Sequence, residues 1–255
     1  MSGRFAGQSA LVTGGGSGLG RMIAEALARE GAAVVVADSD GDATKAAVQA
    51  ITDDGGTAIP SVGDVRRMAD VQAMVEAARA AGPLKVVVLS AAVEVRRSVV
   101  ECTDEEWRLV LDTNLKGPFL CMHEAIPAMQ DGGAVIALGS VLGLMAAPGF
   151  PAYTASKGAL VNLCKQAAIE HAADGVRVNV VAPSATDTGL FIKTAERSGN
   201  AEEVKRRVAE GSPMGRLGRG GEVVDTVLFL ASDAAAYISG TVIPVDGAAA
   251  ARRIL

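Results

Sequence analysis

Histidine and cysteine are scarce in this chain. Its 255 residues include two histidines, His123 and His171, and three cysteines, Cys102, Cys121 and Cys164. Neither histidine has another histidine, a cysteine or a paired carboxylate at metal-binding spacing, so we expect no bound metal. The cysteines form an odd set without a CxxC pair, which favours reduced, partly buried thiols over a disulfide framework. This usage predicts a cytoplasmic protein.

An excess of basic residues is also lacking. Asp and Glu number 29 against 24 Lys and Arg, which gives a net charge of −5 and a pI near 5.2. Proteins that bind nucleic acid usually carry a basic surface, so we expect no such partner. The first residues, MSGRFAGQSALVTGG, have too short an apolar stretch for a secretory signal and no transit-peptide character.

Charge is missing altogether from residues 132–156. The apolar part, residues 134–152, approaches the ~20 residues of a membrane-spanning helix. Glycine and proline interrupt it at Gly139, Gly143, Pro148, Gly149 and Pro151. These residues favour a strand followed by a loop over a continuous helix, so we expect no membrane span. An uncharged loop of this kind suits the wall of a pocket.

Apolar runs of strand length alternate with helical stretches along the chain. The predicted strands are 10–13, 33–37, 58–61, 86–90, 134–139, 176–181 and 241–245, and the predicted helices are 19–30, 42–52, 68–80, 104–129, 152–171 and 222–230. Strands that are apolar throughout indicate a parallel sheet covered on both faces. We therefore predict a single α/β domain over residues 1–255, with a doubly wound, seven-stranded, Rossmann-like parallel sheet.

Residues 189–221 interrupt this alternation. The segment is charged, contains several glycines and is weakly helical in its middle. It follows the sixth predicted strand, at the edge where such sheets bind ligands. We interpret it as a substrate lid; a surface excursion is the alternative.

A glycine-rich turn, TGGGSGLG at 13–20, joins the first predicted strand to the first helix. Such a turn lets the backbone approach a pyrophosphate, whose charge meets the helix N-terminus. Asp38 ends the second strand, where a carboxylate accepts hydrogen bonds from the adenosine ribose and repels a 2′-phosphate. No Arg or Lys lies within the turn, although Arg21 follows it. We therefore predict NAD, with NADP less favoured; the alternative for Asp38 is a cap on the following turn.

Tyr153 and Lys157 are separated by one helical turn, so their side chains project from the same face. A cation beside a phenol favours the phenolate and lowers the pKa of the tyrosine. The pair is therefore a candidate proton-transfer group. Taken alone, the spacing is better explained by a solvated pair on a helix surface.

With these residues in place, the chain resembles the short-chain dehydrogenase/reductase family in its compact single-domain branch. The resemblance runs from end to end, and its motifs occur in the family's order: TGGGSGLG at 13–20, GDV at 63–65, DTN at 112–114, GS at 139–140, YTASK at 153–157 and VNVVAP at 178–183. Three segments depart from the family pattern. LSAA at 89–92 stands where the family has Asn-Asn-Ala-Gly, and Pro183 is followed by Ser184 in place of glycine. Near the C-terminus, Asp246-Gly247 is followed by Ala248 in place of a second glycine.

The resemblance implies a set of site residues. Catalysis would rest on Asn114, Ser140, Tyr153 and Lys157. Cofactor contacts would come from Gly14, Ser17, Gly18, Leu19, Gly20, Asp38, Asp64, Val65, Leu89, Ala91, Tyr153, Lys157, Pro183, Thr186 and Thr188.

The resemblance also implies a role for each catalytic residue. Tyr153 would exchange a proton with the substrate oxygen, Ser140 would donate a hydrogen bond to that oxygen, and Lys157 would hold the nicotinamide ribose. Asn114 would hold a water that links Lys157 to solvent. The pocket walls are expected to be apolar: Val141, Leu142, Leu144, Met145, Phe150, Leu190 and Phe191. Glu94 and Arg96 are interpreted as solvated charges at the rim.

The predicted activity is hydride transfer between NAD(H) and a small, largely apolar secondary alcohol or ketone. One alternative is a 3-oxoacyl thioester reductase, which would prefer NADPH and need basic residues for an acidic carrier, here Lys193, Lys205, Arg206 and Arg207. The other is a non-catalytic dinucleotide-binding regulator, which the LSAA departure would favour. By resemblance we expect a homotetramer or homodimer.

Overall fold

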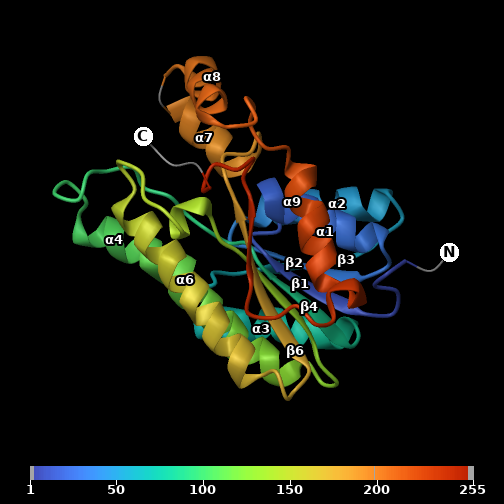
Figure 1. Ribbon diagram of the computed structural model, residues 1–255. Coiled ribbons are helices and arrows are strands. Elements are labelled where there is room, and N and C mark those ends of the chain that lie inside the picture. Colours follow the sequence, from blue (N-terminus) through green and yellow to red (C-terminus); the bar gives the residue numbers. More distant parts are fainter. Residues whose placement is uncertain (1–2, 198, 252–255) are drawn as a thin grey trace.

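A seven-stranded parallel sheet with helices on both faces forms the protein (Figure 1). The computed structural model describes residues 3–197 and 199–251. The strand order is β3-β2-β1-β4-β5-β6-β7, and all neighbouring strands pair in parallel. The strands are β1 (Ser9–Thr13), β2 (Ala33–Asp38), β3 (Thr57–Val62), β4 (Leu84–Leu89), β5 (Gly133–Leu138), β6 (Val176–Pro183) and β7 (Val242–Val245). The predicted doubly wound, Rossmann-like fold is confirmed.

The central strands are apolar because both of their faces are covered. Every residue of β1 is buried, and β5 and β6 are buried almost throughout. One face packs against α3 (Met68–Ala81), α5 (Gly117–Ala125) and α6 (Pro151–Glu170). The other packs against α1 (Gly18–Arg29), α2 (Gly41–Asp53) and α9 (Gly220–Ala231). The order in which successive strands join the sheet reverses between β1 and β4, which is where sheets of this type form a ligand crevice.

The helix predicted over 104–129 is interrupted, which corrects that prediction. It consists of α4 (Asp104–Leu111), a π-helical turn (Asp112–Lys116), α5, and a 3₁₀ turn (Ile126–Ala128). Pro118 has no backbone N–H, so it cannot bond the carbonyl four residues earlier, and the helix widens at this point. The other predicted strands and helices begin and end within two residues of their observed bounds.

Residues 189–221 form two helices beyond the carboxyl edge of the sheet, α7 (Gly189–Arg197) and α8 (Ala201–Gly211). They stand at the top of Figure 1, away from the two main helical layers. Asn200 begins α8, and its side chain accepts a hydrogen bond from the Glu203 N–H. The segment is therefore more regular than the sequence indicates.

Among the described residues, no helix is long and apolar enough to cross a membrane. Residues 132–156 form β5, a short 3₁₀ turn (Val141–Gly143) and the start of α6, as the interrupting glycines and prolines predict. Within the same part of the chain, no three His, Cys, Asp or Glu side chains come together as a metal site would require.

Candidate active site

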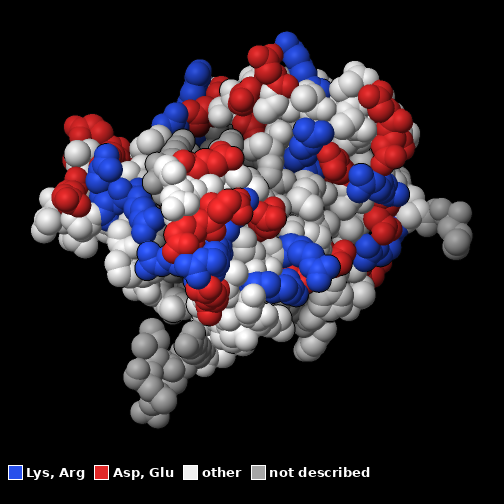
Figure 2. All heavy atoms as spheres, turned by 90° about the horizontal axis from the view of Figure 1, so that it is seen from above, with Lys and Arg blue, Asp and Glu red and all other residues white. Residues whose placement is uncertain are grey.

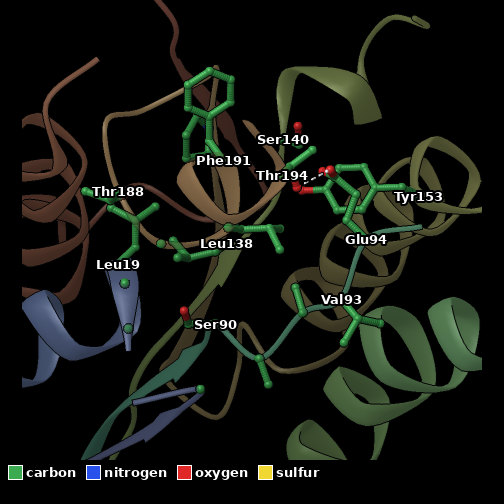
Figure 3. A pocket seen from close by; sticks show the side chains of 18 of the residues that line it. Leu19, Ser90, Val93, Glu94, Leu138, Ser140, Tyr153, Thr188, Phe191 and Thr194 are labelled. Atoms are coloured by element: carbon green, nitrogen blue, oxygen red, sulfur yellow. Dashed lines mark hydrogen bonds between the residues drawn. The ribbon is translucent and has the colours of Figure 1, made fainter. Parts of the chain in front are cut away.

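A cavity of about 860 Å³ lies at the carboxyl ends of β1, β4, β5 and β6 (Figure 3). Its walls come from the glycine turn after β1, the loops after β4 and β5, the start of α6, and α7 with part of α8. This volume lies in the range of pockets that bind small molecules and cofactors. Nearly all of the predicted site residues line it, from Gly14 at one end to Tyr153 and Lys157 at the other.

The glycine turn is shaped for close backbone approach. A Cβ atom added to Gly14, whose φ is +66°, would lie 2.8 Å from the backbone of Ala91, and one added to Gly20 would lie 2.1 Å from the Gly14 carbonyl oxygen. Side chains are therefore excluded at both positions. α1 begins at Gly18, and the residues of its first turn line the cavity next to Ser17. This arrangement fits a pyrophosphate at the helix N-terminus.

Asp38 lies at the end of β2 and holds the turn in place. Its Oδ2 accepts a hydrogen bond from the Gly16 N–H at 3.0 Å, and its Oδ1 accepts one from the Asp40 N–H at 3.1 Å. A carboxylate accepts about four hydrogen bonds, so this capping role leaves acceptor positions for ribose hydroxyls. Arg21, which follows the turn, has an acidic partner of its own, because its Nε donates to Glu25 at 2.8 Å.

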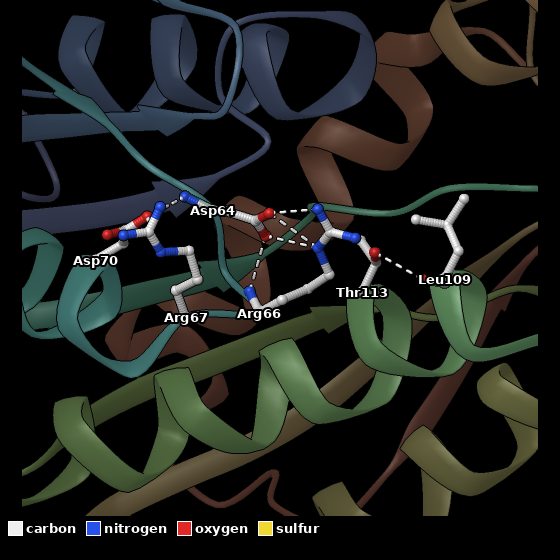
Figure 4. A network of polar contacts seen from close by, with 6 residues as sticks. All are labelled: Asp64, Arg66, Arg67, Asp70, Leu109 and Thr113. Atoms are coloured by element: carbon white, nitrogen blue, oxygen red, sulfur yellow. Dashed lines mark hydrogen bonds and ion pairs between the residues drawn. The ribbon is translucent and has the colours of Figure 1, made fainter. Parts of the chain in front are cut away.

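The predicted adenine-contacting residues, Asp64 and Val65, also line the cavity. The Asp64 carboxylate is paired with the Arg66 guanidinium, whose hydrogen bonds hold the pKa of Asp64 below its ordinary value. The Asp64 N–H donates to Asp70 at 2.9 Å, which fixes the loop between β3 and α3 (Figure 4). Asp64 therefore stays ionised and oriented, with Arg66 beside it at the cavity wall.

Thr13, the last residue of β1, fixes the backbone of the LSAA segment. The Thr13 Oγ1 accepts hydrogen bonds from the N–H groups of Ser90 at 3.1 Å and Ala91 at 3.3 Å. Leu89, which was expected to contact the cofactor, does not line the cavity, because it is the last residue of β4 and its side chain is buried in the core. The wall is formed by Ser90, Ala91 and Ala92.

Tyr153 lies in the first turn of α6 and is 8% exposed. Burial is the main cause that raises the pKa of its phenol, and the Glu94 carboxylate raises it further. A hydrogen bond with Ser140 acts in the opposite direction. With protein groups alone, the pKa of Tyr153 is thus raised, whereas the Tyr–Lys spacing predicts a lowered value.

Lys157 is buried one helical turn after Tyr153. Its Nζ donates a hydrogen bond to the Leu138 carbonyl at 2.7 Å and lies 5.6 Å from the centroid of the Tyr153 ring. Burial lowers the pKa of Lys157 to about 8, because the charged form loses solvation. The alternative of a solvated surface pair is therefore wrong for these two residues.

Ser140 follows β5 and caps the 3₁₀ turn. Its Oγ accepts a hydrogen bond from the Leu142 N–H at 3.1 Å, and the side chain lines the cavity close to Tyr153 (Figure 3). A Cβ atom on Gly143 would lie 2.8 Å from the Lys157 backbone, so the turn packs tightly against α6. The serine and tyrosine are held on one rigid unit.

Asn114 does not line the cavity. It is fully buried in the π-helical turn, where its Nδ2 donates to the Val93 carbonyl at 2.9 Å and to Ser156 Oγ at 3.3 Å. Its Oδ1 accepts from the Val93 N–H at 2.8 Å. The Asn114 side chain therefore fixes the loop after β4. Its backbone carbonyl lacks the usual α-helical donor, because residue 118 is proline.

Most of the predicted apolar wall is present. Val141, Leu142, Phe150, Leu190 and Phe191 line the cavity. Leu144 and Met145 instead point outward, being 45% and 38% exposed, because the turn after Ser140 carries them past the cavity.

Two charged residues of the loop after β4 also line the cavity. Arg96 is exposed and lies over the Phe150 ring, 5.4 Å from its centroid, as a rim residue would. Glu94 is half-buried beside Tyr153, which corrects its interpretation as a solvated rim charge. In Figure 3, Glu94, Tyr153 and Thr194 converge on one part of the cavity.

Several wall residues were missed in the sequence. They lie on α7 and α8: Thr194, Ala195, Val204, Arg207 and Val208. The spacing of Leu190, Phe191, Thr194 and Ala195 marks one face of a helix, and this signal identifies the cavity side of α7. The predicted residues Pro183, Thr186 and Thr188 complete the wall between β6 and α7.

Among the described side chains, the face around α7 and α8 carries both charges without a basic excess around Lys205 and Arg206. Figure 2 looks onto this end of the molecule, where basic and acidic side chains alternate. Lys205 lies near Glu202 and Asp187, and Arg206 pairs with Glu203 and Glu210. Pairing of this kind leaves little net positive charge for an acidic partner.

Comparison with known proteins places the chain among dehydrogenases and reductases. A family model described as Enoyl-(Acyl carrier protein) reductase matches residues 14–248. The chain is 37% identical to the cyclohexanol dehydrogenase of Acinetobacter sp., over 97% of both chains. It is 35% identical to 2-(S)-hydroxypropyl-CoM dehydrogenase 3 of Xanthobacter autotrophicus, over 97% of this chain and 98% of that one.

A solved structure agrees closely. The crystal structure of levodione reductase superposes with a TM-score of 0.94, at 30% identity, and covers 98% of this chain and all of that one. The fold, the order of the motifs and these relatives lead to one conclusion: the chain belongs to the short-chain dehydrogenase/reductase family and is an oxidoreductase of that family.

Proposed function

We propose that the protein transfers a hydride between NAD(H) and a small, largely apolar secondary alcohol or its ketone, with Tyr153 as the general acid/base. The observation that carries this proposal is one continuous cavity with a glycine turn at one end and Ser140, Tyr153 and buried Lys157 at the other. A nicotinamide ring bound there supplies the acceptor or donor of the hydride.

The protein's own groups would manage the proton. Tyr153 takes the proton from the substrate alcohol during oxidation and returns it to the ketone oxygen during reduction. Ser140 donates a hydrogen bond to the same oxygen and fixes its position. The Lys157 ammonium would stabilise the phenolate of Tyr153 and is the group that would hold the ribose of the cofactor. Apolar walls exclude water and strengthen these interactions.

Lys157 also needs a route to solvent for its proton. The side-chain amide of Asn114 is engaged by Val93 and Ser156, so a water relay through that amide is disfavoured. The Asn114 backbone carbonyl suits the role better, because Pro118 deprives it of a helical N–H.

NAD is the proposed cofactor, in preference to NADP. Asp38 lines the cavity at the end of β2 and would repel a 2′-phosphate. Arg21, the basic residue that follows the glycine turn, is paired with Glu25. Both observations support a cofactor that carries free ribose hydroxyls.

Cyclic secondary alcohols are the proposed substrate class. The names of two relatives, cyclohexanol dehydrogenase and cis-4-hydroxycyclohexanecarboxylate dehydrogenase, the latter from Sinomonas cyclohexanicum and 37% identical, refer to ring alcohols. The apolar residues Val141, Leu142 and Phe150 beside Tyr153 suit the hydrocarbon face of such a ring.

The test is NADH formation across a panel of linear, cyclic and aromatic secondary alcohols, with NAD⁺ and NADP⁺ in parallel. We expect turnover with NAD⁺ and the highest kcat/KM with a cyclic alcohol. Turnover with NADP⁺ alone would contradict the role given to Asp38. The absence of turnover with every alcohol would contradict the proposed reaction.

A 3-oxoacyl thioester reductase is the second candidate. The 3-oxoacyl-[acyl-carrier-protein] reductase of Staphylococcus aureus is 37% identical over 94% of this chain, and exposed Arg207 lies at the cavity wall. Against it, Lys205 and Arg206 are already paired with acidic residues. The side chain of Lys193, the fourth basic residue considered, lies outside the described part. Preferred reduction of acetoacetyl-CoA with NADPH would select this candidate.

A non-catalytic dinucleotide-binding regulator would keep the cavity without turnover. The presence of Ser140, Tyr153 and Lys157 around one space argues against it. Binding of NADH without turnover of any alcohol or ketone would select it.

We also propose that residues 189–221 act as a substrate lid. α7 supplies the wall opposite Tyr153, and the Gly189 and Gly18 backbones touch, since a Cβ on Gly189 would lie 2.8 Å from the Gly18 Cα. The three cysteines are free thiols, which supports a cytoplasmic location.

A further inference from the structure

One charged side chain in the cavity has no role in the proposed reaction. Glu94 comes from the loop after β4, is half-buried and lines the same wall as the phenol of Tyr153. Its charge reaches the phenol, because it raises the pKa of Tyr153. Figure 3 shows its carboxylate beside the Tyr153 ring. The reacting oxygen of a substrate held by Tyr153 would therefore lie close to this carboxylate.

Glu94 is joined to the opposite wall of the cavity. The Thr194 hydroxyl on α7 donates a hydrogen bond to Glu94 Oε1 at 3.0 Å, across 100 positions of sequence. The bond fixes the carboxylate where the loop after β4 meets the proposed lid. It also means that the direction of Glu94 is set by the fold, whereas a rim glutamate turns freely in solvent.

A carboxylate in this position can select a substrate. It accepts hydrogen bonds in about four directions, so it can bond Thr194 and a substrate donor together. The nearby side chains of Val93, Leu142 and Phe150 are apolar and offer a hydroxyl group no hydrogen bond. A site that hydrogen-bonds a substrate hydroxyl discriminates strongly against the analogue that lacks it.

We propose that Glu94 is a specificity-determining residue: its carboxylate accepts a hydrogen bond from a second substrate hydroxyl, on the carbon next to the reacting carbon. The preferred substrates are then vicinal diols of a small ring and the corresponding hydroxyketones. This inference rests on the proposed function and narrows its substrate class. Thr194 acts as a positioning residue that holds the Glu94 carboxylate toward the second hydroxyl.

The test compares kcat/KM for a vicinal cyclohexanediol and for cyclohexanol, with NAD⁺, in four proteins. These are the wild type, Glu94→Gln, Thr194→Val and the control Glu101→Gln. Glutamine keeps the size of Glu94 and removes its charge, and valine keeps the shape of Thr194 and removes its hydroxyl. Glu101 lies on the same loop as Glu94, is exposed and bonds Ser98 outside the cavity.

We expect the wild type and Glu101→Gln to favour the diol by about tenfold or more, as a charge-assisted hydrogen bond implies. Glu94→Gln should lower that ratio by about tenfold, and Thr194→Val should lower it by a smaller factor. Thermal unfolding of each variant shows that it is folded.

Two results would overturn the proposal. One is a wild type that turns over both substrates with no preference for the diol. The other is a diol preference that persists in both Glu94→Gln and Thr194→Val. Either result leaves the proposed function standing, because cyclohexanol is still oxidised. Absence of turnover with both substrates would contradict the proposed function itself, and the role of Glu94 with it.

Discussion

Tyr153 and Lys157 show how strongly burial sets the chemistry of single residues. Removing both groups from water favours their neutral forms, so the pKa of the phenol rises and that of the ammonium falls to about 8. The sequence gives only the spacing of the pair, which predicts a lowered phenol pKa. The opposite direction follows from the enclosing walls and from Glu94, neither of which local spacing reveals.

Lys157→Met tests the cost of burying this cation. Below pH 8, folding buries a charged Lys157, whereas the unfolded chain keeps it charged in water up to its ordinary pKa. Because the pKa of Lys157 is lower in the folded than in the unfolded chain, burying its charge destabilises the folded protein. This destabilisation is absent above the unfolded-state pKa and is fully present once the pH has fallen below about 8.

We expect the cofactor-free Lys157→Met variant to be more stable than the wild type at pH 7, by about 3 kcal/mol. This gap in the free energy of unfolding should shrink as pH rises from 8 to 10. Urea unfolding at several pH values measures it. Lys165→Met, an exposed position on the same helix, is the control and should show no such change. A gap that is constant with pH would contradict a buried, titrating Lys157.

At the scale of elements, the break between α4 and α5 connects the helical layer to the active site. The π-helical turn carries Asn114 inward, and its amide binds both backbone groups of Val93, the residue before Glu94. Sequence periodicity predicts one long helix here. Pro118 signals the interruption, but the wider turn and the partners of Asn114 depend on contacts 21 residues away in the sequence.

Asn114→Ala should therefore act through the loop after β4. Val93 would lose the partners of its N–H and C=O groups, and we expect a loss of about 1–3 kcal/mol in the free energy of unfolding. The kcat for alcohol oxidation should fall as well, because the loop after β4, which forms a wall of the cavity, is released. Asn162→Ala, at an exposed position on α6, should change stability by less than about 0.5 kcal/mol.

The two measurements together decide the role of Asn114. Equal stability of Asn114→Ala and Asn162→Ala would show that the bonds to Val93 contribute nothing. A loss of stability without any change in kcat would confine Asn114 to a structural role.

At the scale of the whole molecule, the fold was predictable because its strands are apolar throughout and its motifs fix the strand that each loop follows. The regular arrangement of α7 and α8 and the placement of Glu94 beside Tyr153 were not, since both arise from packing between distant segments. The sequence shows that the LSAA segment departs from the family pattern. The hydrogen bonds by which Thr13 fixes this segment are seen only in the structure.

The helical layer of α4, α5 and α6 exposes large apolar side chains: Trp107 is 40% exposed, Phe119 49% and Ile169 76%. Large apolar side chains left exposed on a helical layer are typical of association surfaces when they form a patch. We therefore predict that the protein is a homotetramer or homodimer assembled through this layer. Light scattering coupled to size exclusion measures the mass of the wild type.

Substitution of Ile169 by Glu should then produce smaller species. Val62→Glu, which places the same charge on an exposed residue of the edge strand β3, should leave the mass unchanged. A monomeric wild type, or one mass for all three proteins, would contradict assembly through α4, α5 and α6.

The measurement that tests the account most directly is alcohol oxidation by Tyr153→Phe, read by NADH absorbance beside NADH binding by fluorescence. Phenylalanine keeps the aromatic ring that lines the cavity and removes only the hydroxyl group. The account predicts that kcat falls by at least about 100-fold, as expected for loss of a general base, while the affinity for NADH changes little. Turnover close to that of the wild type would contradict the central role of Tyr153.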